Sequence, residues 1–287
     1  MAHENPIRIR RAFHTVVSPT NSLLKLYRSA LREGATREGW MAIEGPVIVA
    51  EALREDLAAG NAGYARSASR IRSVLVASSA TEQFRDLLEQ LPEDAELAQA
   101  PDAVFRSVAA TVNPQGIAAL VEVQPPEFVS MLRQREPLLL IACGVQDPGN
   151  LGTMMRSAEA FGASALATLK STVSPLNPKA VRASAGAAFR LPMYAGFEEG
   201  PLFTELDRAG VRTIAADPYA PAAITACDLR GPLAILTGNE AGGLEPELSR
   251  RAESRLRIPM QPGINSINAA TAAAIFLYEA ARQRGLK

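Results

Sequence analysis

Apolar runs alternate with helical patterns through the second half of the chain, and this alternation constrains the fold more than any other feature. The run at 137–144 is continuously apolar, which is typical of a strand buried on both faces of a parallel sheet. Further strands are predicted at 164–169, 211–217, 232–238 and 255–260, and helices at 150–161, 178–186, 202–210, 245–252 and 266–284. Repeated strands and helices predict a parallel α/β sheet covered by helices on both faces.

The first half has similar patterns on a smaller scale. Helices are predicted at 21–31, 46–53, 81–91 and 102–109, and strands at 40–45, 71–78, 96–100 and 113–123. Two adjacent prolines, Pro125 and Pro126, lie in a charged stretch that separates the halves and has room for a short helix. We therefore expect a smaller α/β domain over 1–123, a linker over 124–136 and a second domain over 137–287.

Charge, cysteine and histidine content exclude several classes of protein. The 287 residues include 30 basic and 30 acidic side chains, so no global field attracts nucleic acid. Residues 1–40 hold seven basic and three acidic residues, a net charge of +4 that suits either a solvated tail or a surface that contacts phosphates. The two cysteines, Cys143 and Cys227, are far from each other and from the two histidines near the N-terminus, so they cannot by themselves make a disulfide framework or a zinc site. A Ser-His-Asp triad lacks a plausible histidine.

The chain also lacks the apolar segments that membrane proteins and secreted proteins carry. No run approaches the ~18 apolar residues of a membrane span, and the N-terminus has charges but no apolar core of a signal peptide. We therefore expect a cytoplasmic protein with no membrane partner and no metal. Cys143 lies inside the apolar run at 137–144 and is predicted to be a core residue.

Three glycine-marked segments, 150–156, 236–244 and 258–268, each come at or after the end of a predicted strand. The carboxyl ends of parallel strands meet at one edge of a sheet, where ligands bind, so the segments can converge there. They offer amide, guanidinium, carboxylate and hydroxyl groups from Asn150, Arg156, Glu240, Ser266 and Asn268. The chain has neither the G-x-G-x-x-G of dinucleotide-binding folds nor the GxxxxGK[ST] of P-loops, which argues against both kinds of site.

Each segment taken alone also has a purely structural interpretation. Asn150 follows a Pro-Gly turn and is well placed as a helix N-cap, and Gly152 allows another backbone to come close. Arg156 would then be either a surface arginine or a planar cation aimed at a phosphate or a developing oxyanion. Ser266 and Asn268 offer capping side chains to the Ala-rich helix that follows, which suits a core or a dimer interface.

Taken together and in this order, the segments resemble the SpoU (TrmH-like) family of RNA ribose 2′-O-methyltransferases. The family's motifs are matched by Asn150, Gly152 and Arg156, by Gly238, Glu240 and Gly243, and by Ile258 to Asn268 with Ile267 in place of Leu. Residues 177–192 also resemble the family. The first half resembles the L30e-like domain often fused in front, through the stretches at 40–53 and 113–121.

The resemblance implies a trefoil-knotted α/β fold, S-adenosylmethionine as cofactor and a homodimer through the knotted domain. Arg156 would stabilise the oxyanion or a nearby phosphate. Asn150 would orient Arg156 or the ribose. Glu240 would tie the knot loops, and Ser266 with Asn268 would position the nucleotide. Contacts to the cofactor would come from Leu236, Thr237, Gly238, Ile258, Met260 and Ile267.

The third motif departs from the family pattern at its rim. Its glycine, Gly263, lies one position later than usual, Asn265 replaces an acidic residue, and Ala270 replaces a serine. These changes bear on substrate details rather than on the reaction. The expected function is methyl transfer to a ribose 2′-OH of ribosomal RNA. The alternatives are transfer RNA as substrate, a non-catalytic RNA-binding or assembly factor on the same fold, and a nucleotide-dependent oxidoreductase, against which the missing fingerprint argues.

Overall fold

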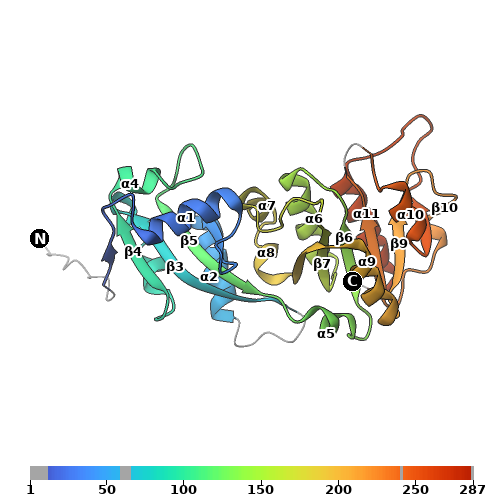
Figure 1. Cartoon of the computed structure of the whole chain (residues 1–287), viewed down its shortest axis with the longest axis horizontal. Coiled ribbons are helices and arrows are strands. Elements are labelled where there is room, and N and C mark those ends of the chain that lie inside the picture. The colour runs from blue at the N-terminus through green and yellow to red at the C-terminus, as the bar shows by residue number, and fades with distance from the viewer. Residues whose placement is uncertain (1–11, 59–65, 240–241, 286–287) are drawn as a thin grey trace, which may run out of the picture. The chain divides into compact units, whose positions relative to one another are not determined.

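The computed structural model describes residues 12–58, 66–239 and 242–285. The described residues group into two compact units, the first within 1–60 and 69–123 and the second within 61–68 and 124–287. The predicted α/β class, with a parallel sheet in the second half and a smaller N-terminal part, is confirmed (Figure 1).

The first unit is a five-stranded sheet of order β1-β4-β3-β5-β2, in which β2 runs antiparallel to β5. Its strands are β1 (His14–Thr15), β2 (Met41–Glu44), β3 (Ala68–Ala77), β4 (Glu96–Ala100) and β5 (Ile117–Gln124). Its α-helices are α1 (Ser22–Glu33), α2 (Pro46–Ala58), α3 (Arg85–Glu89) and α4 (Asp102–Arg106). Asn21 caps α1, since its side chain accepts a hydrogen bond from the Leu23 amide at 2.8 Å.

The helix predicted at 81–91 is wrong in length, because only α3 forms an α-helix there. Just before it, hydrogen bonds between side chains and backbone join residues 78–79 to the segment at 100–102. The Ser78 hydroxyl donates to the carbonyl of Ala100, and Asp102 accepts from the amide of Ser79. Such side-chain bonds offer the chain an alternative to helix, and a short 3-10 turn, η2 (Ser78–Ala80), results.

The second unit is a seven-stranded sheet of order β10-β12-β9-β11-β6-β7-β8, with all neighbours parallel. Its strands are β6 (Leu138–Ala142), β7 (Ala165–Leu169), β8 (Met193–Phe197), β9 (Arg212–Ala216), β10 (Ala222–Ala223), β11 (Leu233–Thr237) and β12 (Ser254–Arg257). Its helices are α5 (Phe128–Leu132), α6 (Pro148–Ala160), α7 (Pro178–Ala183), α8 (Ala187–Arg190), α9 (Glu199–Arg208), the 3-10 turn η3 (Ile224–Ala226), α10 (Pro246–Arg251) and α11 (Ala269–Gln283).

Both faces of the central strands are buried, as their apolar sequences predict. One core cluster joins β6, β7 and β11 to α9, and includes Met131 and Leu132 of α5, the short helix expected between the halves. Helix α11 packs against α6, β11 and β9. Cys143 is confirmed as a core residue, and burial raises the pKa of its thiol, which therefore stays protonated at neutral pH.

Three predictions in the second unit are corrected. Strand β8 was missed because it is an edge strand interrupted by Gly196, whose φ is 74°, and its pairing with β7 shifts register. The helix predicted at 178–186 ends at Ala183, since Ala185 and Gly186 have φ angles of 50° and 87° that no α-helix accepts. The helix predicted from 202 starts three residues earlier, with Pro201 in its first turn, where proline is tolerated.

The prediction that Gly152 permits a close backbone approach is confirmed. A Cβ on Gly152 would lie 2.4 Å from the Ala180 carbonyl oxygen and 2.5 Å from the Ala183 Cβ. The glycine therefore lets α6 and α7 pack in direct backbone contact.

Gly152→Ala is accordingly expected to destabilise the protein by about 1–3 kcal/mol, the usual cost of overpacking. This cost outweighs the ~1 kcal/mol that alanine gains over glycine inside a helix. Urea denaturation measures the change. Gly200→Ala in α9 is the control, because a Cβ there meets nothing within 4 Å. Equal changes in the two variants would contradict the packing argument.

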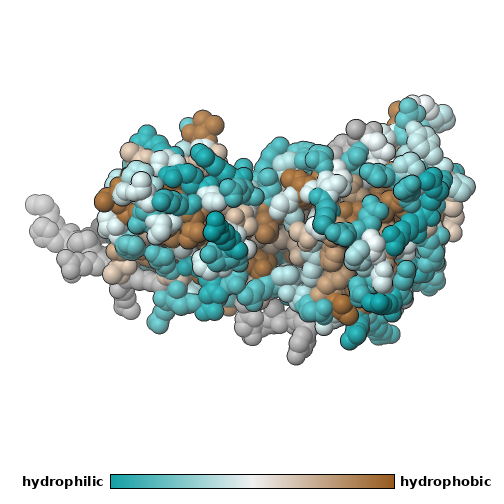
Figure 2. Space-filling view, in the orientation of Figure 1, coloured by the Kyte–Doolittle hydropathy of each residue, from teal (hydrophilic) through white to brown (hydrophobic). Residues whose placement is uncertain are grey.

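The surface is mixed, and hydrophobic residues lie scattered among hydrophilic ones on the face drawn in Figure 2. The most exposed large hydrophobic residues of the described chain are Val17, Val47, Leu57, Val112, Tyr219, Ile264 and Tyr278. Two of them, Tyr219 and Ile264, lie in loops that follow β9 and β12. These two loops follow the carboxyl ends of their strands, where a parallel sheet binds its ligands.

Candidate functional site

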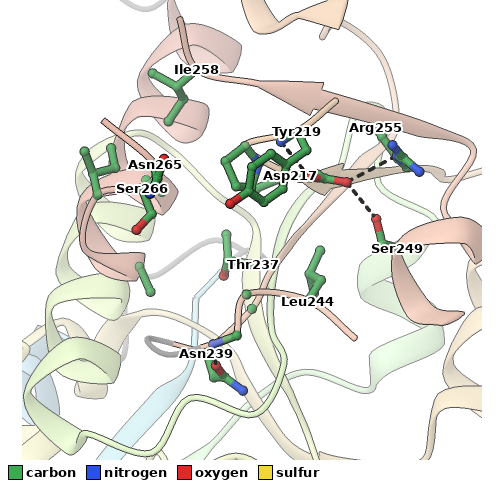
Figure 3. A pocket seen from close by; sticks show the side chains of 18 of the residues that line it. Asp217, Tyr219, Thr237, Asn239, Leu244, Ser249, Arg255, Ile258, Asn265 and Ser266 are labelled. Carbon is green, nitrogen blue, oxygen red and sulfur yellow. Dashed lines mark hydrogen bonds and ion pairs between the residues drawn. The ribbon is translucent and has the colours of Figure 1, made fainter. Parts of the chain in front are cut away.

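A cavity of about 410 Å³ opens at the carboxyl ends of three neighbouring strands, β12, β9 and β11 (Figure 3). Its walls are the loop after β9 (216–219), the end of β11 with its glycine-rich loop, and the loop after β12. Helix α11 contributes Ala269, Ala272 and Phe276. The convergence predicted for the second and third glycine-marked segments therefore occurs, at the edge where parallel sheets bind ligands.

Most residues predicted to contact a cofactor line this cavity, namely Thr237, Gly238, Ile258, Met260 and Ile267. Leu236 does not line it. Successive residues of a strand point to opposite faces, so Leu236 packs fully buried in the core cluster while Thr237 faces the cavity.

The glycine-rich loop turns back on itself directly after β11. The amide of Asn239 donates to the Gly243 carbonyl at 3.0 Å, and the amide of Gly243 donates to the Asn239 carbonyl at 3.2 Å. The Asn239 side chain also accepts from the Gly242 amide at 2.6 Å. A Cβ on Gly238 would lie 1.9 Å from the Gly243 carbonyl carbon, so only glycine fits there. Glu240 lies outside the described residues.

Two predicted residues from distant segments meet directly. The Asn268 Nδ2 donates to the Asn150 Oδ1 at 2.9 Å across 118 positions of sequence. The Asn268 Oδ1 caps α11, accepting from the amides of Ala270 at 2.9 Å and Thr271 at 3.2 Å. The capping prediction for Asn268 is thus confirmed, and the carboxamide is fixed at both ends.

The predicted N-cap at Asn150 is wrong, because Asp147 caps α6 and Asn150 lies within its first turn. The Asp147 carboxylate accepts from the Gly149 amide at 3.1 Å and pairs with Lys179 at 3.1 Å. These interactions, the backbone hydrogen bond first, hold the pKa of Asp147 below its usual value. Since Asp147 takes the capping role, the Asn150 side chain meets Asn268 instead.

Arg156 and Ser266 are both exposed, in different settings. Ser266 lines the cavity from the loop after β12. Arg156 lies on α6, one helical turn after Gly152, and does not line the cavity. No ion pair in the described part of the chain includes Arg156, so its guanidinium faces solvent.

The wall formed by residues 216–219 was not predicted from the sequence. Asp217 lies there, and its carboxylate is near Ser249 of α10 and Arg255 of β12, while Tyr219 lines the cavity itself. Its place in the sequence could have indicated it, because the loop directly follows a predicted strand of a parallel sheet, where ligands bind.

Two features are absent from the described part of the chain. The described residues contain no cluster of three or more His, Cys, Asp or Glu side chains able to hold a metal ion. No helix within 12–58, 66–239 and 242–285 has both the length and the apolar character to cross a membrane.

The second unit is a parallel α/β sheet with a cavity over three strand ends, which is where sheets of this class bind small ligands. The family model of the SpoU rRNA methylases matches residues 137–278. The "23S rRNA (guanosine-2'-O-)-methyltransferase RlmB" of Xanthomonas campestris pv. campestris is 31% identical over 225 residues, covering 76% of this chain and 90% of that protein. This chain belongs to the SpoU family, as its motifs predicted.

Other similar proteins agree with this membership. The "Uncharacterized tRNA/rRNA methyltransferase slr1673" of Synechocystis sp. is 33% identical over 181 residues, which cover 63% of this chain and 65% of that protein. The crystal structure of the SpoU methyltransferase AviRb from Streptomyces viridochromogenes, in complex with the cofactor AdoMet, superposes with a TM-score of 0.76. It is 25% identical and covers 92% of this chain and 98% of its own.

Proposed function

We propose that this protein transfers a methyl group from S-adenosylmethionine to a ribose 2′-OH of ribosomal RNA. The observation that carries the proposal is the meeting of the three motif segments at one sheet edge. Asn150 of the first binds Asn268 of the third, and Gly238 and Ile258 from the other two segments line one cavity. The names of the similar proteins, a 23S rRNA 2′-O-methyltransferase and an AdoMet-bound SpoU enzyme, support the same assignment.

The cavity suits S-adenosylmethionine in size and in lining. Its volume falls within the range of roughly 300–1,000 Å³ that small-molecule sites have. Ile258, Met260 and Ile267 offer apolar contacts, and Gly238 presents backbone without a side chain. When bound, S-adenosylmethionine supplies a methyl group already activated on a sulfonium. Thr237 and these four residues would hold it.

The protein's contribution is to hold the ribose in line and to stabilise charge. The Asn150–Asn268 bond fixes the Asn150 carboxamide, which with Ser266 at the cavity rim positions the nucleotide. A guanidinium group is a poor proton acceptor, so we assign Arg156 to stabilising the developing oxyanion or an adjacent phosphate rather than to acting as a base. Recognition of the 2′-OH restricts the enzyme to RNA.

The proposal extends to the topology of the second unit, to its assembly into a dimer and to the place where the enzyme works. We propose that the loops of the second unit form a trefoil knot and that two copies pair through α6 and α11. Tyr278 of α11 is 54% exposed and packs edge-on against Phe161, the residue directly after α6, with ring centroids 5.7 Å apart. This gives the face an apolar, aromatic character suited to a partner. The enzyme would work in the cytoplasm.

The first unit is proposed to be an L30e-like RNA-binding domain over 1–123, followed by a linker over 124–136 and the methyltransferase domain over 137–287. Helix α1 carries Lys25, Arg28 and Arg32, and the sequence before residue 12 adds three arginines, so residues 1–40 have a net charge of +4. Transfer RNA is the alternative substrate, since the name of the Synechocystis protein includes both RNAs.

Cofactor choice gives the first test of this function. The protein should bind S-adenosylmethionine and its demethylated product with affinities in the micromolar range or tighter, and should not bind NAD. Binding of S-adenosylmethionine is expected because the second and third glycine-marked segments line one cavity. NAD should not bind because the chain lacks the G-x-G-x-x-G fingerprint of dinucleotide-binding folds. Calorimetric titration measures all three ligands. Heat of binding from NAD alone would end the proposal.

Removal of residues 1–123 tests whether the first unit binds the RNA while the second unit binds the cofactor and forms the dimer. The shortened protein, which keeps α5 with its buried Met131 and Leu132, should remain a dimer and bind cofactor normally. Its RNA affinity should fall about tenfold or more, and the slope of log affinity against log salt should become shallower, because phosphate-neutralising residues are lost. Light scattering, calorimetry and RNA binding at two salt concentrations give the readouts. An unchanged salt slope with full methyl transfer would show that RNA is recruited elsewhere.

A further inference from the structure

The loop after β9 forms a wall of the cavity that no motif of the sequence covers. Asp217 in this loop is mostly buried, with 17% of its side chain exposed. Its carboxylate accepts from the Tyr219 amide at 2.9 Å and from the Ser249 hydroxyl at 3.3 Å, and lies 3.2 Å from the Arg255 Nε. One mostly buried carboxylate thus ties the loop to α10 and β12, and fixes the backbone at Tyr219.

Tyr219 is the residue that this anchor holds in place. It lines the cavity although it is 77% exposed, and Figure 3 shows its ring lying between Asp217 and the loop that carries Asn265 and Ser266. No ring contact in the described part of the chain includes Tyr219. A large, mostly exposed aromatic ring at the rim of a ligand cavity, on a backbone fixed by Asp217, has its face available to the ligand.

We propose that Tyr219 stacks on the adenine ring of S-adenosylmethionine and that Asp217 is the positioning residue that holds it there. This inference rests on the proposed function. The cavity offers a flat aromatic surface and, from Ile258, Ile267 and Phe276, an apolar one, which suits a planar base rather than the charged amino-acid end. Asp217 is not a free counter-ion for the sulfonium or the ammonium group, because Arg255 already pairs with it.

The test measures binding rather than turnover. Calorimetry with S-adenosylmethionine, S-adenosylhomocysteine and 5′-methylthioadenosine compares the wild type with Tyr219→Ala and Tyr219→Phe. The alanine variant should bind all three ligands about tenfold or more weakly, since all share the adenine. The phenylalanine variant keeps the ring and should stay within about twofold. Equal affinity of wild type and Tyr219→Ala would overturn the proposal, as would a loss confined to RNA binding, which would place the ring on an RNA base.

The role of Asp217 is tested by comparing single and double variants at Asp217 and Tyr219. Asp217→Ala should weaken binding of the same ligands, and Asp217→Asn, which keeps an acceptor for the Tyr219 amide, should recover most of it. If Asp217 acts through Tyr219, the double variant Asp217→Ala/Tyr219→Ala binds no more weakly than Tyr219→Ala alone. Additive losses in variants of unchanged melting temperature would overturn the positioning role. A wild type that binds none of the three ligands would instead sink the proposed function.

Discussion

Arg156→Ala is expected to lower the rate of methyl transfer about 100–1000-fold, the cost of removing one preorganised donor to a developing negative charge. The affinity for S-adenosylmethionine should stay within about twofold, because Arg156 lies on α6 and does not line the cavity. Stability should also be unchanged, since the side chain is exposed and makes no ion pair in the described residues. Single-turnover methylation, cofactor titration and thermal unfolding separate the three effects.

Two further variants make this result specific. Arg156→Lys should fail almost as badly, because a point charge cannot copy the planar fork of a guanidinium. Arg208→Ala removes an exposed arginine of α9 that pairs with Glu205 at 2.8 Å, and should leave the rate unchanged. An Arg156→Ala enzyme within a few-fold of the wild-type rate would show that the arginine has no part in catalysis.

The strands of the second sheet were predictable because burial on both faces leaves a continuous apolar run in the sequence. Residues 137–144 and 232–238 correspond to β6 and β11, which lie side by side in the middle of the sheet. Edge strands carry no such run. β8 is bent at Gly196, and β10 has only two residues, so neither leaves a periodic pattern.

Helix ends were harder to predict than helices, because they depend on contacts that form only in the fold. Asn150 and Asp147 are both suitable capping residues in sequence. The folded chain selects Asp147 as the cap of α6, where its carboxylate also pairs with Lys179 of α7. Ala185 adopts a positive φ that its sequence does not signal, and this divides α7 from α8.

The part of the site made by loops that directly follow strands could be predicted, because such loops meet at one sheet edge. Contacts between side chains of different elements could not be predicted. The glycine-marked segments after β11 and β12 were expected to converge and do line one cavity. The anchoring of Asp217 by Ser249 and Arg255 depends on α10 and β12 lying beside the loop, which no local pattern encodes.

Gly238→Ala is expected to have the second large effect. An added Cβ would lie 1.9 Å from the carbonyl carbon of Gly243, 2.1 Å from its oxygen and 2.1 Å from the Leu244 amide nitrogen. These are backbone atoms in a loop closed by the paired Asn239–Gly243 hydrogen bonds, so no side chain can rotate away and the loop must open. The clash should therefore cost more than the ~1–3 kcal/mol of ordinary overpacking.

Because the loop lines the cavity, Gly238→Ala should lower the affinity for S-adenosylmethionine about 100-fold or more and reduce the melting temperature. Gly242→Ala is the matched control in the same loop. Its Cβ would lie 3.6 Å from the Asn239 Oδ1, an ordinary contact, and its amide would still donate to that oxygen, so binding should stay within about threefold. Calorimetry and thermal unfolding of both variants decide the matter. If the two alanines weaken binding equally, the loop tolerates a side chain at Gly238, and the close approach of Gly243 is not what shapes the cofactor site.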